Sequence, residues 1–478
     1  MRFTTVTAAA AILSLGISTA FAGNARPYSF RLVASGDNAN GMTFLPPALN
    51  DAGSVAFDAT KYLVGSAILT GPDFTADAFV STADPAGPFR SGNQPYINNA
   101  GSIAFNGTVR ATGEGGIFVG HDTAHNLAAG IGAIAVAPAD INEPGQVAMK
   151  ADFGLYTHNP LRNHDGIYVG RAGVTGATFV AENTRLSEPG RFRRIDSAPA
   201  INDAGTVAFV AQTWDQTATG YVTGIYSGNT TDTALIDSTG SFLTFGGGWV
   251  DINNAGTLLF TATPDGSLVT GLYRGSAAGT ELVAQENNDF LDINARDVNN
   301  NGDVVFNAQL GGGGFNGIFT GPSRERDRVV GPGDTLFGKT VRDAFFRTGG
   351  FNDNGEVAFS FITTDSERGV AVATPAMMGD ANVDQRVDLT DFNVLAANFG
   401  STNADWWHAD FNGDERVNLD DFNILAAHFG QSAGASGPTS DDWSRLSAAV
   451  PEPAAAGATL LACTALPRVR RRRRPSVA

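Results

Sequence analysis

Short apolar runs that follow polar turns recur along most of this chain. The clearest copy is residues 201–209, in which Ile-Asn-Asp-Ala-Gly precedes Thr-Val-Ala-Phe. Six further copies have their asparagine at positions 50, 98, 142, 253, 299 and 352. The glycines of the seven copies, at 53, 101, 145, 205, 256, 302 and 355, are about 50 residues apart on average, a period typical of repeat arrays and propellers.

Each copy predicts a turn followed by a strand. The asparagine side chain can bond the main chain two residues on, and the glycine supplies the positive φ of the turn. Val207 and Phe209 then point to one face of the strand and Ala208 to the other. Because all three are apolar, we expect a strand covered on both faces, as in stacked four-stranded blades. Two more apolar phrases accompany most copies, for example at 166–170 and 282–284.

Seven such units predict a mainly β fold, a seven-bladed β-propeller-like domain over residues 27–375. The array begins with a lone strand near 30–36 and ends with 369–374. This offset predicts that the first strand completes the last blade and closes the ring, which removes exposed sheet edges. An open stack of blades or two sandwiches is the alternative.

The repeated phrase resembles that of the tandem NxxGxxxAF-repeat proteins, which are exported bacterial proteins with varied surface anchors. In this chain phenylalanine follows glycine by four residues rather than five, so the resemblance depends on the recurring phrase. The resemblance implies export to the cell surface and does not imply an enzymatic reaction.

Charge and cysteine content exclude several classes of function. The net charge is −17, and it is about −23 without the two ends of the chain, so the surface repels nucleic acid and favours cations. We therefore expect no nucleic-acid partner. The single cysteine, Cys463, excludes an intrachain disulfide and most cysteine metal sites.

Residues 1–22 have the pattern of a secretory signal peptide. Arg2 precedes an apolar run, and small residues at Ala20 and Ala22 predict cleavage after Ala22. A transmembrane anchor is the alternative, but the apolar run is short.

Residues 379–430 consist of two near-copies 30 residues apart, each with the ligand order of a calcium loop. Oxygen-bearing side chains occupy loop positions 1, 3, 5, 9 and 12, and position 7 offers its main-chain carbonyl. The first loop supplies Asp380, Asn382, Asp384, Arg386, Asp388 and Asp391, and the second supplies Asp410, Asn412, Asp414, Arg416, Asn418 and Asp421. Two calcium ions are therefore expected; two acidic solvated turns without metal are the alternative.

A helix is predicted after each loop, over 389–399 and 419–429. Apolar residues at helical spacing form one stripe on each helix, and we expect the stripes to be the mutual core of the pair. The stripes are Leu389, Phe392, Leu395 and Phe399, and Leu419, Phe422, Leu425 and Phe429.

This loop-helix pair resembles a type I dockerin, the small EF-hand-like α-helical domain that binds cohesin modules in a calcium-dependent way. The resemblance implies a cohesin-like or other envelope protein as partner. Gln385 and Glu415 stand at position 6, where glycine is usual, and imply some strain in each loop. The recognition positions correspond to 389–390 and 419–420, which carry no Ser-Thr pair.

The C-terminal end has a flexible linker at 431–449 followed by an ordered series of features over 450–474. Pro451, Glu452 and Pro453 precede a short apolar run and then a cluster of arginines. The apolar run is shorter than the ~20 residues of a spanning helix. The series resembles the PEP-CTERM sorting signal, which implies cleavage by an exosortase near 451–453 and a Gram-negative cell surface or matrix. A basic disordered tail is the alternative.

The search for catalytic motifs yields little. The spacing of His121 and His125 suits a metal only on a helix, and a loop is expected there. His158, His164 and Asp165 lie in the next repeat. Two functions therefore remain: a non-catalytic surface protein with a binding or scaffold propeller, or an extracellular carbohydrate-active enzyme, a glycosyl hydrolase acting on polysaccharide from the propeller face. The enzyme would need acidic and aromatic residues of different blades to meet at one end of the channel.

Overall fold

The computed structural model describes residues 26–36, 41–130, 135–152, 165–182, 192–196, 198–215, 220–228, 233–237, 242–276 and 278–432. The described residues up to Pro375 form one compact unit, and those from Ala376 onward form a second. Within these residues no helix is long and apolar enough to cross a membrane.

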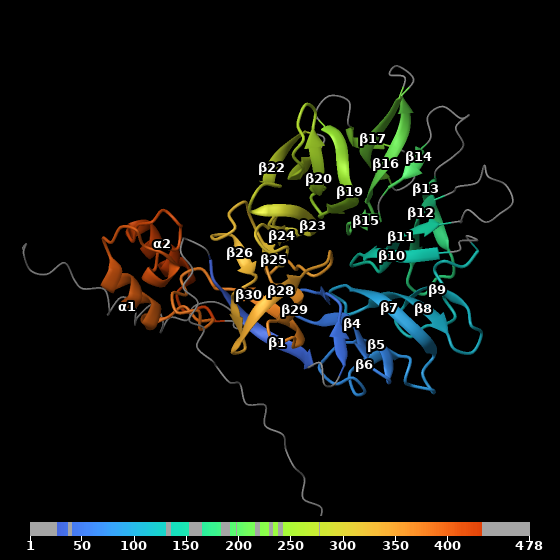
Figure 1. The fold of residues 1–478 in the computed structure, drawn as a ribbon, viewed down its shortest axis with the longest axis horizontal. Coiled ribbons are helices and arrows are strands. Elements are labelled where there is room, and N and C mark those ends of the chain that lie inside the picture. The colour runs from blue at the N-terminus through green and yellow to red at the C-terminus, as the bar shows by residue number, and fades with distance from the viewer. Residues whose placement is uncertain are drawn as a thin grey trace, which may run out of the picture. The chain divides into compact units, whose positions relative to one another are not determined.

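The first unit is a seven-bladed β-propeller, as predicted, with its sheets arranged around a common centre (Figure 1). Blade 1 contains β2 (Met42–Phe44), β3 (Ala48–Leu49), β4 (Val55–Lys61), β5 (Gly65–Leu69) and β6 (Ala78–Ser81). Blade 2 contains β7 (Phe89–Ile97), β8 (Ile103–Val109) and β9 (Gly115–Val119). Blade 3 contains β10 (Ala135–Ile141), β11 (Gln146–Asp152), β12 (Asp165–Arg171) and β13 (Ala177–Glu182).

The remaining four blades follow the same antiparallel order. Blade 4 contains β14 (Phe192–Ile195), β15 (Ala200–Ile201), β16 (Val207–Asp215), β17 (Gly220–Gly228) and β18 (Thr233–Asp237). Blade 5 contains β19 (Phe242–Ile252), β20 (Leu258–Pro264), β21 (Gly271–Ser276) and β22 (Gly279–Gln285). Blade 6 contains β23 (Phe290–Val298), β24 (Val304–Leu310), β25 (Asn316–Phe319) and β26 (Arg328–Val330). Blade 7 contains β27 (Thr335–Leu336), β28 (Lys339–Phe345), β29 (Val357–Thr363), β30 (Arg368–Pro375) and β1 (Tyr28–Gly36).

The first strand closes the ring, as the offset of the repeats predicts. β1 pairs antiparallel with β30, and the register runs from Tyr28 opposite Pro375 to Gly36 opposite Arg368. The outer strand of blade 7 therefore comes from the beginning of the domain and its inner strands from the end. Closure leaves no open edge between the first and last blades.

The Val-Ala-Phe strands are buried on both faces, as expected. Val207, Ala208 and Phe209 of β16 are each at most 1% exposed, because neighbouring blades cover both sides of the sheet. Blade 2 has three strands within the described residues. Along the outer edge of β9, the Leu127 main-chain N–H donates to the Ile117 carbonyl, so a loop covers part of this edge.

The second unit contains α1 (Leu389–Asn398), a 3₁₀ turn η1 (Trp406–His408) and α2 (Leu419–His428). Each α-helix begins at a capping box: the side chain of Asp388 or Asn418 caps the first turn, and the carboxylate three residues later accepts the cap's own N–H. Both helices start at position 10 of the predicted loops, directly after the capping residue at position 9. The sequence places these starts correctly.

The predicted apolar stripes are only partly the shared core of this unit. Phe392, Leu395, Leu425 and Phe429 are buried, as expected. Phe399 is 56% exposed and Leu419 is 62% exposed, so the prediction is wrong for these two side chains. Both lie at a helix end, but the equivalent Phe429 is buried, so the exposure of these side chains depends on how the two helices pack.

Candidate functional site

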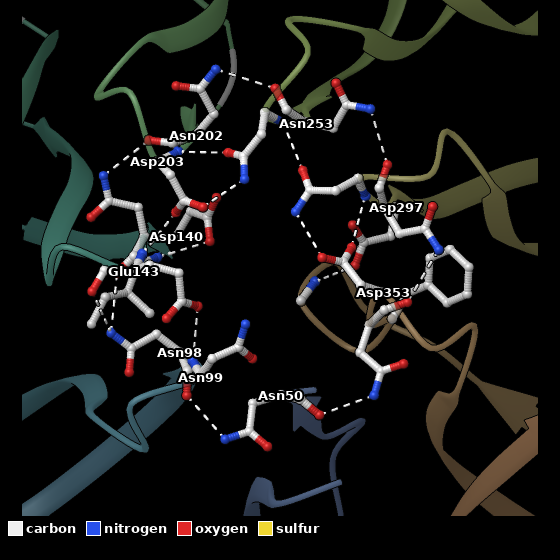
Figure 2. Close-up of a pocket in the computed structure, with 18 of the residues that line it drawn as sticks. Asn50, Asn98, Asn99, Asp140, Glu143, Asn202, Asp203, Asn253, Asp297 and Asp353 are labelled. Atoms are coloured by element: carbon white, nitrogen blue, oxygen red, sulfur yellow. Dashed lines mark hydrogen bonds between the residues drawn. The ribbon is translucent and has the colours of Figure 1, made fainter. Parts of the chain in front are cut away.

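The recurring phrase of the repeats builds a closed ring of hydrogen bonds at the propeller axis (Figure 2). In every blade the amide nitrogen of the repeated asparagine donates to the main-chain carbonyl of its counterpart in the next blade, over 2.9–3.2 Å. The ring runs through Asn50, Asn98, Asn142, Asn202, Asn253, Asn299 and Asn352, and Asn352 donates back to Asn50. All seven side chains are at least 94% buried.

The same asparagines also fix their own turns. Each amide oxygen accepts the main-chain N–H four residues on, over 2.7–3.0 Å. In three copies the amide oxygen also accepts the expected N–H two residues on, from Ala255, Asn301 and Asn354. The turn therefore relies mainly on the longer bond, which closes over a glycine with φ between 74° and 85° in all seven copies.

A second ring lies beside the first. The residue after each asparagine donates its main-chain N–H to a side-chain oxygen of its counterpart in the next blade, over 2.7–2.9 Å. Its members are Asp51, Asn99, Glu143, Asp203, Asn254, Asn300 and Asp353. This need for an acceptor explains why every copy has Asp, Asn or Glu at that position.

Three aspartates add a partial third layer to the axis. Asp140 accepts the N–H of Ile201, and Asp251 accepts the N–H of Val298. Asp297 accepts the N–H of Gly349, and each of the three bonds joins a blade to the next one. Sequence reasoning missed these residues, although an Asp-(Ile/Val)-Asn triplet at 140–142, 251–253 and 297–299 is a signal that could have found them.

Burial and the neighbouring carboxylate raise the pKa of two of these aspartates, Asp140 and Asp297. Burial, reinforced by the charge of Asp251, raises the pKa of Asp140 to about 8. Burial also raises the pKa of Asp297 well above its ordinary value, and the neighbouring Asp251 adds to the rise. Both shifts favour the protonated form of these two carboxyl groups.

Carboxyl groups of different blades thus meet near the axis, as the enzyme alternative requires, but their hydrogen bonds indicate a structural role. Each has a main-chain partner in the adjacent blade. The opening that they line has a volume of about 160 Å³, below the roughly 300–1,000 Å³ of most ligand pockets. The axis is therefore better explained as the element that joins the blades than as a substrate site.

The two predicted calcium loops have matching hydrogen bonds. In the first loop, Asp380 accepts the N–H groups of Asp384 and Gln385, and Asp391 accepts those of Ala381 and Asp388. In the second loop, Asp410 accepts the N–H groups of Gly413 and Glu415, and Asp421 accepts those of Phe411 and Asn418. The donor beside position 6 is therefore position 4 in the second loop and position 5 in the first. The first and last ligand positions of both loops are at most 1% exposed.

Main-chain bonds join each loop to the segment after the opposite helix. Val387 pairs with Gly430 and Gln431, and Val417 pairs with Gly400 and Ser401. The pairing is reciprocal, so the two loops lie in one pseudo-symmetric unit. Such pairing is how two short loop-helix motifs stabilise each other.

The buried carboxyl groups fit a site for a hard cation. Burial raises the pKa of Asp380 to about 7 and that of Asp391 to about 6, and neighbouring carboxylates add to both shifts. Burial likewise raises the pKa of Asp410. A divalent cation bound by these oxygens would favour their ionised form.

The loops provide a ligand order rather than a preformed acidic cage. Among the described residues, no three His, Cys, Asp or Glu side chains converge as a metal cluster. Asn382, Asn412 and Asn418, together with the carbonyls of Arg386 and Arg416, would have to supply the remaining oxygens. The twelve ligands remain a prediction.

The substitutions at position 6 do occupy strained backbone, as the sequence implied. Gln385 has φ 66° and Glu415 has φ 65°, where glycine would be unstrained. Position 4 adds a difference that the sequence analysis missed. The second loop has Gly413 there with φ 75°, whereas the first has the β-branched Val383 with φ 59°.

The histidines of blade 2 do not converge on a metal position. His121 Nε2 lies 2.8 Å from the Phe79 carbonyl, and its ring packs on Phe79. His125 instead pairs with Asp122. His158 and His164 lie outside the described residues, as do the processing positions Ala22, Pro451, Glu452 and Pro453.

Comparison with known sequences assigns both units. A family described as a family of unknown function (DUF7453) matches residues 49–347, more than half of the chain. The chain belongs to this family. The dockerin type I domain matches residues 378–430. The DUF7453 propeller is thus followed by a dockerin domain, a module that binds calcium and cohesin partners and occurs in extracellular and cell-surface proteins.

Solved structures similar to the DUF7453 propeller are distant. One from a study of two prolyl endopeptidases has 13% identity and a TM-score of 0.41, and the match covers 72% of this chain and 48% of that one. TolB from Acinetobacter baumannii has 11% identity and a TM-score of 0.31, with coverage of 70% and 79%. The Dos1 propeller has 10% identity and a TM-score of 0.34, with coverage of 75% and 94%. The chain spans about half the length of the endopeptidase. No curated protein matches the chain. At these TM-scores and identities, none of the similar structures bears on function.

Proposed function

We propose that this DUF7453 protein is an exported, non-catalytic scaffold that attaches through its dockerin domain to a cohesin-like envelope protein. The proposal rests on the pair of loops. Each loop has oxygen-bearing side chains at positions 1, 3, 5, 9 and 12, and a capped helix begins directly after position 9. Two calcium ions, one in each loop, would hold the helices in the orientation that a partner recognises.

The described helices leave apolar surface for such a partner. Leu419 is 62% exposed at the start of α2, and Phe399 is 56% exposed after α1. Leu419 belongs to one of the two positions that the dockerin resemblance assigns to recognition. Since the Ser-Thr pair of cellulosomal dockerins is absent, the proposed partner is a cohesin-like protein of another specificity.

Export and anchoring complete the proposal. Cleavage after Ala22 and exosortase processing near 451–453 would place residues 27–375 and 379–430 at the surface or in the matrix of a Gram-negative-type bacterium. There the propeller would serve as a binding body, with extracellular polysaccharide as one ligand class. The hydrogen-bonded, narrow channel supports a non-catalytic role.

Calorimetric titration of the full chain with Ca²⁺ after chelation tests the proposal. We expect two binding events, lost in a variant that carries Asp380→Ala and Asp410→Ala. We also expect chelation to lower the unfolding temperature of the second unit and to leave that of the propeller unchanged, because metal binding contributes directly to folding. Asp420→Ala, at a non-ligand position of α2, is the matched control and should retain both events.

Absence of calcium binding in the wild-type chain would overturn the proposal. Retention of both events in the double variant would overturn the ligand assignment.

A further inference from the structure

Trp406 connects the two calcium loops through a buried side chain. It lies in η1, between the loops, and is 4% exposed. Its indole Nε1 donates to the main-chain carbonyl of Asp380, the first ligand position of the first loop, over 2.7 Å. A donor-only group placed on this peptide fixes its orientation.

The other side of the indole contacts the second loop. The ring packs edge-to-face on Phe411, with the ring centroids 5.3 Å apart and the planes at 79°. The Phe411 main-chain N–H donates over 2.8 Å to Asp421, the last ligand position of the second loop. A continuous path of contacts therefore runs from Asp421 through Phe411 and Trp406 to Asp380.

Hydrogen bonds join the η1 segment to the second loop. Asp405 caps the turn by accepting the N–H of His408, and its own carbonyl accepts the N–H of Asp410 over 3.1 Å. Asp410 is the first ligand position of the second loop. The residue before Trp406 is thus bonded directly to the second loop, and the Trp406 carbonyl accepts the N–H of Ala409, the residue before Asp410.

The first loop carries no tryptophan at the position equivalent to Trp406. Trp406 stands four residues before Asp410, and the residue four before Asp380 is Ala376. Alanine has no side-chain donor and cannot make the corresponding bond to the second loop. The pseudo-symmetric unit is therefore asymmetric at this contact.

We infer that Trp406 is a positioning residue through which order in the second loop raises the calcium affinity of the first. The inference rests on the proposed calcium binding. Ordering of Asp410 and Asp421 fixes Phe411 and the indole, and the indole then holds the Asp380 peptide in its ligating orientation. Calcium binding to the first loop then has a smaller entropy cost, because part of that loop is already ordered. This is positive coupling between the two sites.

The test is a thermodynamic cycle in the full chain with Ca²⁺ as the probe. Trp406→Phe keeps an aromatic ring and removes the hydrogen bond, and Asp410→Ala disables the second loop. We expect Trp406→Phe to weaken the first loop about three- to tenfold, the effect of one buried hydrogen bond. Asp410→Ala should weaken the first loop in the wild-type background and have little further effect in the Trp406→Phe background.

Two further variants separate coupling from simple loss of structure. Trp407→Phe removes the neighbouring, more exposed tryptophan and should leave both calcium affinities unchanged. Tryptophan fluorescence is recorded during the same titrations, and its change on calcium binding should also persist in this variant. Phe411→Leu keeps the indole hydrogen bond and removes the ring contact, so it should reduce the coupling. Circular dichroism should show native helix content in all variants.

The outcomes are distinct. Equal effects of Asp410→Ala with and without Trp406 would overturn the inference while leaving the proposed calcium binding intact. A fluorescence change that persists in Trp406→Phe and disappears in Trp407→Phe would also overturn it. A wild-type chain that binds no calcium would overturn the proposed function and the inference together.

Discussion

At the residue scale, the two calcium loops differ most at position 4. Val383 adopts φ 59°, a conformation that costs a β-branched residue roughly 1–3 kcal/mol, while Gly413 adopts a similar φ in the second loop without that cost. Position 6 carries a residue of positive φ in both loops, so it does not distinguish them. The first loop is therefore the more strained of the two.

Exchange of these two residues tests the strain. We expect Val383→Gly to stabilise the second unit by about 1 kcal/mol and to raise the calcium affinity of the first loop. Gly413→Val should have the opposite effect on the second loop. Thermal unfolding and calcium titration measure both. Because Val383 also packs against the core of this unit, the decisive outcome is Gly413→Val: an unchanged stability of that variant would show that a β-branched residue at position 4 causes no strain.

A second residue-scale prediction concerns Asp140, a buried carboxyl group of the channel. Asp140 has a pKa of about 8 in the folded chain against an ordinary 3.8, with burial as the main cause and Asp251 and Asp203 as the nearby carboxylates that add to it. The folded state binds this proton more tightly than the unfolded state. The resulting stabilisation is fully present below the unfolded pKa and is lost as the pH rises towards 8.

Replacement of Asp140 by asparagine should remove this dependence. The introduced amide would keep an acceptor for the Ile201 N–H and carry no charge at any pH. We expect the difference in unfolding free energy between pH 5 and pH 9 to shrink by about 4 kcal/mol relative to wild type. Asp265→Asn, at an exposed turn, is the control and should leave the pH dependence unchanged. An unchanged dependence in Asp140→Asn would show that this carboxyl is already ionised in the folded chain.

At the scale of elements, the repeated turn does two tasks with one side chain. The Asn202 amide oxygen closes the turn of blade 4 through Thr206, and its amide nitrogen bonds the Asn253 carbonyl of blade 5. Each hairpin is therefore formed and attached to its neighbour by the same residue. This explains why asparagine, which has both a donor and an acceptor, recurs in all seven copies.

Substitution of Asn202 separates the two tasks. Asn202→Asp keeps the acceptor for the turn but places a second oxygen against the Asn253 carbonyl, and Asn202→Ala removes both groups. We expect each to destabilise the propeller by about 1–3 kcal/mol in chemical denaturation. Asn398→Ala, in α1, is the control that should not change the propeller transition; a similar insensitivity of Asn202→Ala would contradict the role of the ring.

At the scale of the whole propeller, stability depends on closure between β1 and β30. Ala34 of β1 is 2% exposed and packs in the core shared with blade 1, whereas Leu32 on the same strand is 41% exposed. The two positions therefore distinguish strand closure from a general effect of an added charge.

We expect Ala34→Asp to lower the unfolding free energy of the propeller by roughly 3 kcal/mol or more, because it buries an unpaired carboxylate in the closing strand. Leu32→Asp should cost less than about 1 kcal/mol. Thermal unfolding and size-exclusion chromatography measure the outcome, since an opened ring exposes strand edges that associate. Equal stability of the two variants would argue that β1 does not hold the ring closed.

Features that depend on neighbouring residues follow from the order of amino acids alone. Turn residues, the alternation of Val207, Ala208 and Phe209, and the order of ligands in 380–391 and 410–421 are local, so they predict the seven blades, the closing strand and the two helix starts. The ends of the apolar stripes were predicted less well, because exposure of Phe399 and Leu419 depends on how the helix pair packs.

Which groups meet across the molecule depends on the folded chain. The amide of Asn142 finds its partner 60 residues away and that of Asn352 finds its partner 302 residues away, and these distances in sequence carry no local signal. The proton on Asp140 depends on burial, and the contact of Trp406 with Asp380 depends on how two loops pack. Side-chain partners across blades and loops follow from the stacking of complete elements, which is why the repeat predicted the propeller but not the hydrogen-bonded rings that hold it together.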